Sequence, residues 1–91
     1  MDVKQAVVRA KEYVLDLFQD ERPVNVGLEE VEFENHANEW VVTIGFSRPW
    51  DEPKNAVAVI AAGPPRRSYK VLRLSNTTGD VLSVRNHEVQ N

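Results

Sequence analysis

The chain has 91 residues, no cysteine and a formal net charge of −3 at pH 7. A chain of this size forms one small domain, here residues 1–91, with little volume for an enclosed active site. The lack of cysteine excludes disulfides and thiolate metal sites. The mild acidity argues against a nucleic-acid-binding protein, which usually carries a basic excess.

The compartment is predicted from the apolar segments. The longest apolar run, residues 56–62, is far shorter than the ~20 residues of a membrane-spanning helix. The first residues include Asp2 and Glu12 and no continuous apolar stretch, so we see no secretory signal. Small secreted domains often rely on disulfides. We therefore expect a cytoplasmic protein without a membrane partner.

The first predicted element is an amphipathic helix of about five turns. Asp2 is a helix-capping residue, and Gln5 follows at the spacing of a capping box. Apolar residues then recur at three- and four-residue steps to form a stripe: Val3, Val7, Ala10, Val14 and Leu17, widened by Ala6, Tyr13 and Phe18. Pro23 should end the helix, because its ring disfavours helical geometry at Arg22.

A β-hairpin is predicted next. Residues 28–34 alternate, with Val31 and Phe33 on one face and Glu30, Glu32 and Glu34 on the other. Residues 35–38 form a polar turn. The second strand, residues 40–46, alternates again, and its apolar face carries Trp40, Val42, Ile44 and Phe46. We expect the apolar faces of both strands to share one core with the helix.

A long proline-rich connection follows at residues 47–66. Connections beyond about 12–15 residues are usually functional or disordered. Its apolar run, residues 56–62, is interpreted in three ways: an extension of a strand, a lid on the sheet, or a segment that a partner covers. Trp50 either packs back onto the sheet or anchors a partner, since tryptophan is enriched in binding hot spots.

The last predicted element is a second hairpin, residues 68–74 and 80–85, in which Gly79 can take the left-handed backbone conformation that a turn followed by a bulge requires. Simple alternation places Tyr69 and Val71 opposite Leu72 and Leu74, and Val81 opposite Leu82 and Val84. Both faces would then be partly apolar, so we expect residues 56–62 or a partner chain to cover the back of these strands. The fold class is α+β, with one N-terminal helix on a four-stranded antiparallel sheet.

Three segments carry a family resemblance: Trp40-Val41-Val42-Thr43, Tyr69-Lys70-Val71 and Thr78-Gly79-Asp80-Val81-Leu82. They resemble strands and the closing turn of the PepSY-like and cystatin-like small domains of bacteria, in which one helix packs across a curved antiparallel sheet. The connection at residues 47–66 departs from that pattern, and the Gln-Val-Val-Ala-Gly-type inhibitory hairpin of the cystatins is absent. The resemblance implies a binding or regulatory module and names no ligand.

The polar clusters do not predict an enzyme or a metal site. The acidic residues Glu29, Glu30, Glu32, Glu34 and Glu39 lie along strands, which is poor geometry for a cation cage and typical of a solvated edge. Arg66, Arg67, Lys70 and Arg73 form a basic cluster suited to carboxylate or phosphate, or simply a set of exposed charges. His36 and His87 lack convergent metal ligands. We predict no catalytic residue, no metal and no cofactor.

Two functions are predicted. The first is a non-enzymatic protein-binding module that regulates, inhibits or neutralises a partner through residues 47–67. The partner is another protein or a second copy, and nucleic acid is not expected. Its predicted contact residues are Trp50, Val57, Val59, Ile60, Arg66, Arg67 and Tyr69. The alternative is a self-associating domain that binds a small ligand between helix and sheet, in a pocket lined by Tyr13, Phe18, Trp40 and Phe46.

Overall fold

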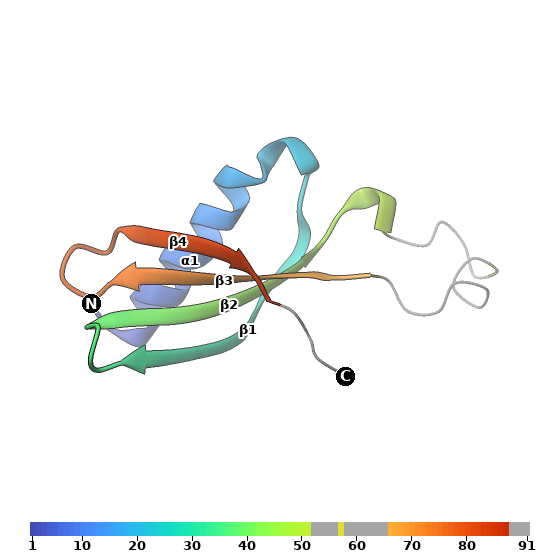
Figure 1. The fold of residues 1–91 in the computed structure, drawn as a ribbon. Helices are drawn as coiled ribbons and strands as arrows, with labels where there is room; N and C mark the ends of the chain where they lie inside the picture. Colours follow the sequence, from blue (N-terminus) through green and yellow to red (C-terminus); the bar gives the residue numbers. More distant parts are fainter. Residues whose placement is uncertain (52–56, 58–65, 88–91) are drawn as a thin grey trace.

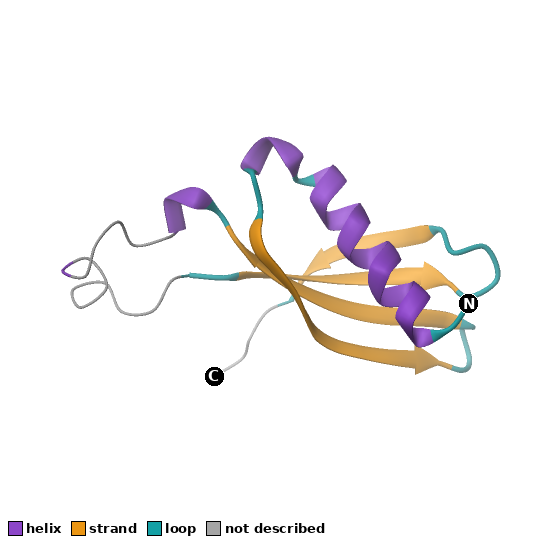
Figure 2. Cartoon of the chain, turned by 180° about the vertical axis from the view of Figure 1, so that it is seen from behind, coloured by secondary structure: helices purple, strands orange, loops and turns teal. Residues whose placement is uncertain are grey.

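The computed structural model describes residues 1–51, 57 and 66–87. Its elements, in chain order, are helix α1 (Val3–Leu17), the 3-10 helix η1 (Gln19–Glu21), strands β1 (Val24–Glu34) and β2 (Glu39–Ser47), the 3-10 helix η2 (Pro49–Asp51), and strands β3 (Ser68–Ser75) and β4 (Val81–Asn86). The strands form one open antiparallel sheet in the order β1-β2-β3-β4, and α1 crosses one of its faces (Figure 1 and Figure 2). The prediction of one helix on a four-stranded antiparallel sheet is confirmed.

Helix α1 begins as predicted and ends earlier than predicted. The Asp2 side chain accepts a hydrogen bond from the Gln5 backbone N–H at 2.8 Å, and the Gln5 side chain accepts one from the Asp2 backbone at 2.8 Å. At the other end, Phe18 leaves helical geometry and its ring packs on Phe46, with ring centroids 5.4 Å apart. Pro23 therefore does not end α1. The chain turns first through η1 and then through Arg22, whose φ is 54°.

The core lies between α1 and the face of the sheet that α1 covers. The helix buries Ala6, Ala10 and Val14, which are spaced four residues apart. The sheet contributes the other fully buried apolar residues: Val42, Ile44, Phe46, Leu72 and Leu74. The small alanine side chains allow close contact between helix and sheet. Val3, Tyr13 and Leu17, predicted in the stripe, are instead exposed, because the buried stripe of α1 is narrower than predicted and follows residues spaced four apart.

Strand β1 is longer than predicted and contains two irregularities. The register with β2 shifts between Val24 and Gly27, where Asn25 has φ 54°, and again between Leu28 and Glu30. An inserted residue of this kind resets the alternation of side chains between the two faces. Gly27 consequently pairs with Gly45, and Glu30 pairs with Thr43, on the face of the sheet opposite α1.

Strand β4 corrects one prediction. Simple alternation placed Val81 opposite Val84, whereas both pack against the core. The reason is a bulge: Arg73 pairs with Ser83 and Leu74 pairs with Val81, so that Leu82 is the extra residue and is 55 % exposed. We expected a cover over the back of this hairpin because both of its faces were predicted to be partly apolar. The bulge changes which residues of β4 face the core, so β4 no longer supports that expectation. The proposed cover is residues 56–62, and all of these except Val57 lie outside the described residues.

The turns of the two hairpins are joined by hydrogen bonds. Gly79 has φ 77°, as predicted for the second turn. The backbone N–H of Asn76 donates to the carbonyl oxygen of Asn38 at 3.1 Å, and the Asn76 side-chain amide donates to the Asn38 side chain at 3.1 Å. The indole N–H of Trp40 donates to Asn76 Oδ1 at 2.9 Å. One end of the sheet is thus held together by side chains from both turns.

Candidate functional site

The predicted contact residues fall into two groups. Trp50 is 66 % exposed and Val57 is 73 % exposed, while Arg66 is also exposed. Arg67 and Tyr69 are half-buried and lie together on the open face of the sheet, opposite α1. Val59 and Ile60 lie outside the described residues. The structure therefore brings Arg67 and Tyr69 together and leaves Trp50 on η2, beyond the end of β2.

Arg48 fixes the backbone that carries Trp50. Its guanidinium pairs with the Glu21 carboxylate of η1, donates to the Ser68 hydroxyl of β3, and lies over the Phe46 ring at 5.2 Å from its centroid. The Asp51 backbone N–H donates to the Arg48 carbonyl oxygen at 2.9 Å, which closes the turn around Trp50. Sequence reasoning missed Arg48. Its position between the strand residue Ser47 and the pair Pro49-Trp50 was the available signal.

These contacts bear on one of the two interpretations of Trp50 that the sequence left open, namely that its ring packs back onto the sheet. The Arg48 guanidinium carbon lies 5.9 Å from the centre of the Trp50 ring. With two thirds of its surface accessible, the Trp50 side chain is not packed back onto the sheet. A large aromatic ring is thus presented on an anchored turn.

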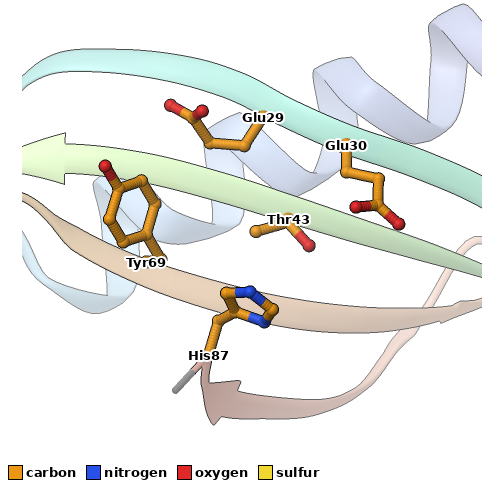
Figure 3. Close-up of a pocket in the computed structure, with 5 residues that line it drawn as sticks. All are labelled: Glu29, Glu30, Thr43, Tyr69 and His87. Carbon is orange, nitrogen blue, oxygen red and sulfur yellow. The ribbon is translucent and has the colours of Figure 1, made fainter. Parts of the chain in front are cut away.

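A second feature is a shallow hollow of about 300 Å³ on the open face of the sheet. Its lining comes from every strand or its immediate continuation: Glu29 and Glu30 from β1, Thr43 from β2, Tyr69 from β3, and His87 just after β4 (Figure 3). Of these residues, only Tyr69 was predicted to contact a partner. The hollow lies at the end of β3 where residues 47–67 rejoin the sheet.

The lack of a side chain at Gly45 makes room for side chains on the open face. A Cβ atom at Gly45 would lie 2.7 Å from Glu29 Oε1 and 3.0 Å from both Arg67 Nη2 and Tyr69 Cε1. Contacts under 3.0 Å require something to move, so the missing side chain is what allows three residues to converge over β2. A glycine within an otherwise β-branched and aromatic strand was the sequence signal for this close approach.

The predicted basic cluster is divided between the two faces of the sheet. Arg67 lies 3.7 Å from the Glu29 carboxylate and donates to the Asn25 carbonyl oxygen at 3.0 Å. Arg73 pairs with Glu39 at 2.8 Å. Lys70 points to the helix side, with its ammonium 5.2 Å from the centre of the Phe18 ring. Alternation along β3 separates Lys70 from its neighbours in sequence, so these cations do not form one phosphate-binding patch.

The residues proposed to line a pocket between helix and sheet are packed together or exposed. Phe46 is fully buried against Phe18, and Trp40 stacks on Phe33 with ring centroids 5.0 Å apart. Tyr13 is exposed on α1. These rings fill the space between helix and sheet, so the alternative function gains no support from them.

Neither a metal site nor a family match indicates a function for the described residues. Within residues 1–51, 57 and 66–87, no group of three or more His, Cys, Asp or Glu side chains could hold a metal ion. No helix formed by these residues has the length and hydropathy of a membrane span. Comparison of the chain with protein-family models, curated proteins and solved structures finds no match.

Proposed function

We propose that this chain is a non-enzymatic protein-binding module whose contact surface is built on residues 47–67. The observation that carries the proposal is the exposure of Trp50 on a turn that Arg48 holds in place. A tryptophan side chain offers a large apolar area, and burying it in a partner is a common source of binding energy. An anchored turn loses little conformational entropy on binding, which favours affinity.

Further residues extend the proposed contact surface. Val57 and Arg66 are exposed, and arginine is enriched with tryptophan in binding hot spots. Val59 and Ile60 belong to the same surface on the sequence argument. The partner is a cytoplasmic protein that the module regulates, inhibits or neutralises, or a second copy of the chain. The resemblance to PepSY-like and cystatin-like domains favours such a binding role.

The proposal is tested with Trp50→Ala and a matched control, Leu15→Ala. Leu15 is an exposed apolar residue on α1, far along the chain from residues 47–67. Circular dichroism and thermal melting first establish that both variants fold. Sedimentation velocity then measures self-association, and quantitative affinity capture from cells that express the chain measures heterologous complexes.

We expect the complex formed by the native chain to persist in Leu15→Ala. In Trp50→Ala its affinity should fall at least about tenfold, as for a binding hot spot. Complexes of equal affinity in both variants and the native chain would remove Trp50 from the interface and contradict the proposal. The same contradiction follows if the native chain forms neither a homo-oligomer nor a complex.

A further inference from the structure

The hollow on the open face of the sheet carries carboxylate charge that the protein leaves largely uncompensated. Glu29 has Arg67 at 3.7 Å, near the outer limit of an ion pair. Glu30 has no ion-pair partner among the described residues, although it pairs with Thr43 across the β1–β2 ladder and lines the same hollow. The chain as a whole is also acidic, with a formal net charge of −3. The hollow therefore favours a cation and disfavours an anion.

A second observation is independent of the acidic residues. Thr43 is only 8 % exposed, and its hydroxyl has no hydrogen-bond partner in the part of the chain that the structure describes. Figure 3 shows this hydroxyl turned into the hollow, between Glu30 and His87. This hydroxyl stays in contact with solvent in the hollow, so it is open to a donor or acceptor that enters there; the buried hydroxyl without a partner among the described residues is that of Ser83.

The lining and size of the hollow indicate which kind of cation it could bind. The carboxylates and His87 do not converge on a metal position within the described residues. The ring of Tyr69 forms one wall, and an aromatic face attracts an ammonium or guanidinium group. A volume of about 300 Å³ is large enough to admit one long side chain.

We infer that this hollow receives a lysine or arginine side chain of the partner protein. The charged group lies between the Glu30 carboxylate and the Thr43 hydroxyl, and its aliphatic part lies against Tyr69. The inference rests on the protein-binding function proposed above and adds the chemistry of the group that is recognised. Tyr69 stands two residues after the segment 47–67, and we assign the hollow to the same contact surface.

The test uses the full chain and defined probes. Acetyl-Gly-Lys-Gly-amide and acetyl-Gly-Arg-Gly-amide are titrated into the isotope-labelled protein, and acetyl-Gly-norleucyl-Gly-amide serves as the uncharged control. For a single side chain we expect a dissociation constant on the order of a millimolar. Amide shifts should concentrate at Glu30, Thr43, Gly45 and Tyr69, and they should weaken with added salt, as expected of a partly exposed charge.

Variants separate recognition from general charge attraction. Glu30→Gln and Thr43→Val should each weaken binding of the better cationic probe, and Glu30→Gln should do so about tenfold. Glu32→Gln removes the same charge from the same face but lies outside the lining of the hollow, so its effect should be small. Equal weakening by Glu32→Gln, equal shifts with the norleucine probe, or no shifts with either cation would overturn the inference.

The same experiment distinguishes a wrong role for the hollow from a wrong proposed function. Trp50→Ala should bind the tripeptides as the native chain does, because Trp50 does not line the hollow. A partner complex that depends on Trp50 but is unaffected by Glu30→Gln and Thr43→Val would leave the protein-binding function standing and refute the role of the hollow.

Discussion

Replacing Asn76 by alanine should destabilise the domain by about 2 kcal/mol. Asn76 lies in the turn between β3 and β4 and accepts the indole N–H of Trp40 at 2.9 Å. Its side-chain amide also donates to Asn38 at 3.1 Å. Alanine removes both bonds, and also the longer contact of 3.5 Å from the N-terminal ammonium of Met1 to Asn76 Oδ1, but keeps the backbone hydrogen bond to Asn38. The substitution therefore isolates the contribution of the side chain.

The magnitude follows from the burial of each bond. The Trp40 bond is partly buried, and a donor left without a partner costs about 1–3 kcal/mol. The bond to Asn38 is exposed and contributes at most about 0.5–1 kcal/mol. For a domain of this size, a loss of about 2 kcal/mol lowers the melting temperature by roughly 8–16 °C.

Urea denaturation followed by far-ultraviolet circular dichroism measures the change in the free energy of unfolding. Asn76→Asp keeps an acceptor for Trp40 and should lose clearly less stability than Asn76→Ala. Thr77→Ala removes only the exposed acceptor of the Asn38 side chain and should stay within about 0.5 kcal/mol of the native chain. If Asn76→Ala also stays within that limit, water replaces Asn76 at the indole, and the turns are not held together in the way we describe.

Three further substitutions test the core, the helix cap and the second turn by the same denaturation assay. Phe46→Ala should cost about 3–5 kcal/mol because the ring is fully buried, whereas Leu82→Ala, in the exposed bulge, should cost less than about 0.5 kcal/mol; similar losses would contradict the assigned core. Asp2→Ala should cost about 1 kcal/mol through loss of the helix cap, and an unchanged stability would show that the cap contributes nothing. Gly79→Ala should cost about 1–3 kcal/mol because φ is 77°, and Gly79→Asn should cost less; the reverse order would refute conformational strain as the cause.

The features predicted correctly from the sequence depend on short-range rules. The capping box at Asp2 and the left-handed turn at Gly79 are set by residues within a few positions of one another. The alternation along β2 identified the strand face that enters the core. Because each strand pairs with its neighbour in the sequence, these local signals were sufficient for the order of the sheet.

The two irregularities of β1, and the side-chain positions that follow from the bulge in β4, escaped prediction because they depend on pairing between strands. Leu28 and Val31 both pair with core residues of β2, although they are three positions apart in the sequence. Val81 and Val84 show the same spacing in β4. Strict alternation cannot place residues three apart on one face, so this spacing was the signal of an inserted residue. Its interpretation requires the register of the partner strand.

The candidate sites were predicted only in part, for a related reason. Trp50 was identified, but the sequence did not decide whether its ring was packed or exposed, because that depends on Arg48 and its distant partner Glu21. The hollow depends on residues from separate strands meeting over Gly45. Three-dimensional proximity of this kind has no counterpart in the spacing of residues along one strand.

The segment that joins β2 to β3 enters and leaves the sheet at neighbouring positions, since Phe46 pairs with Ser68. The entropy of closing a loop grows only with the logarithm of its length, so even a doubled segment would cost about 0.6 kcal/mol more. Substitutions and insertions there can accumulate while the scaffold stays intact. Under the proposed function, specificity for a partner would therefore diverge on an unchanged framework, much as variable loops do on a constant support.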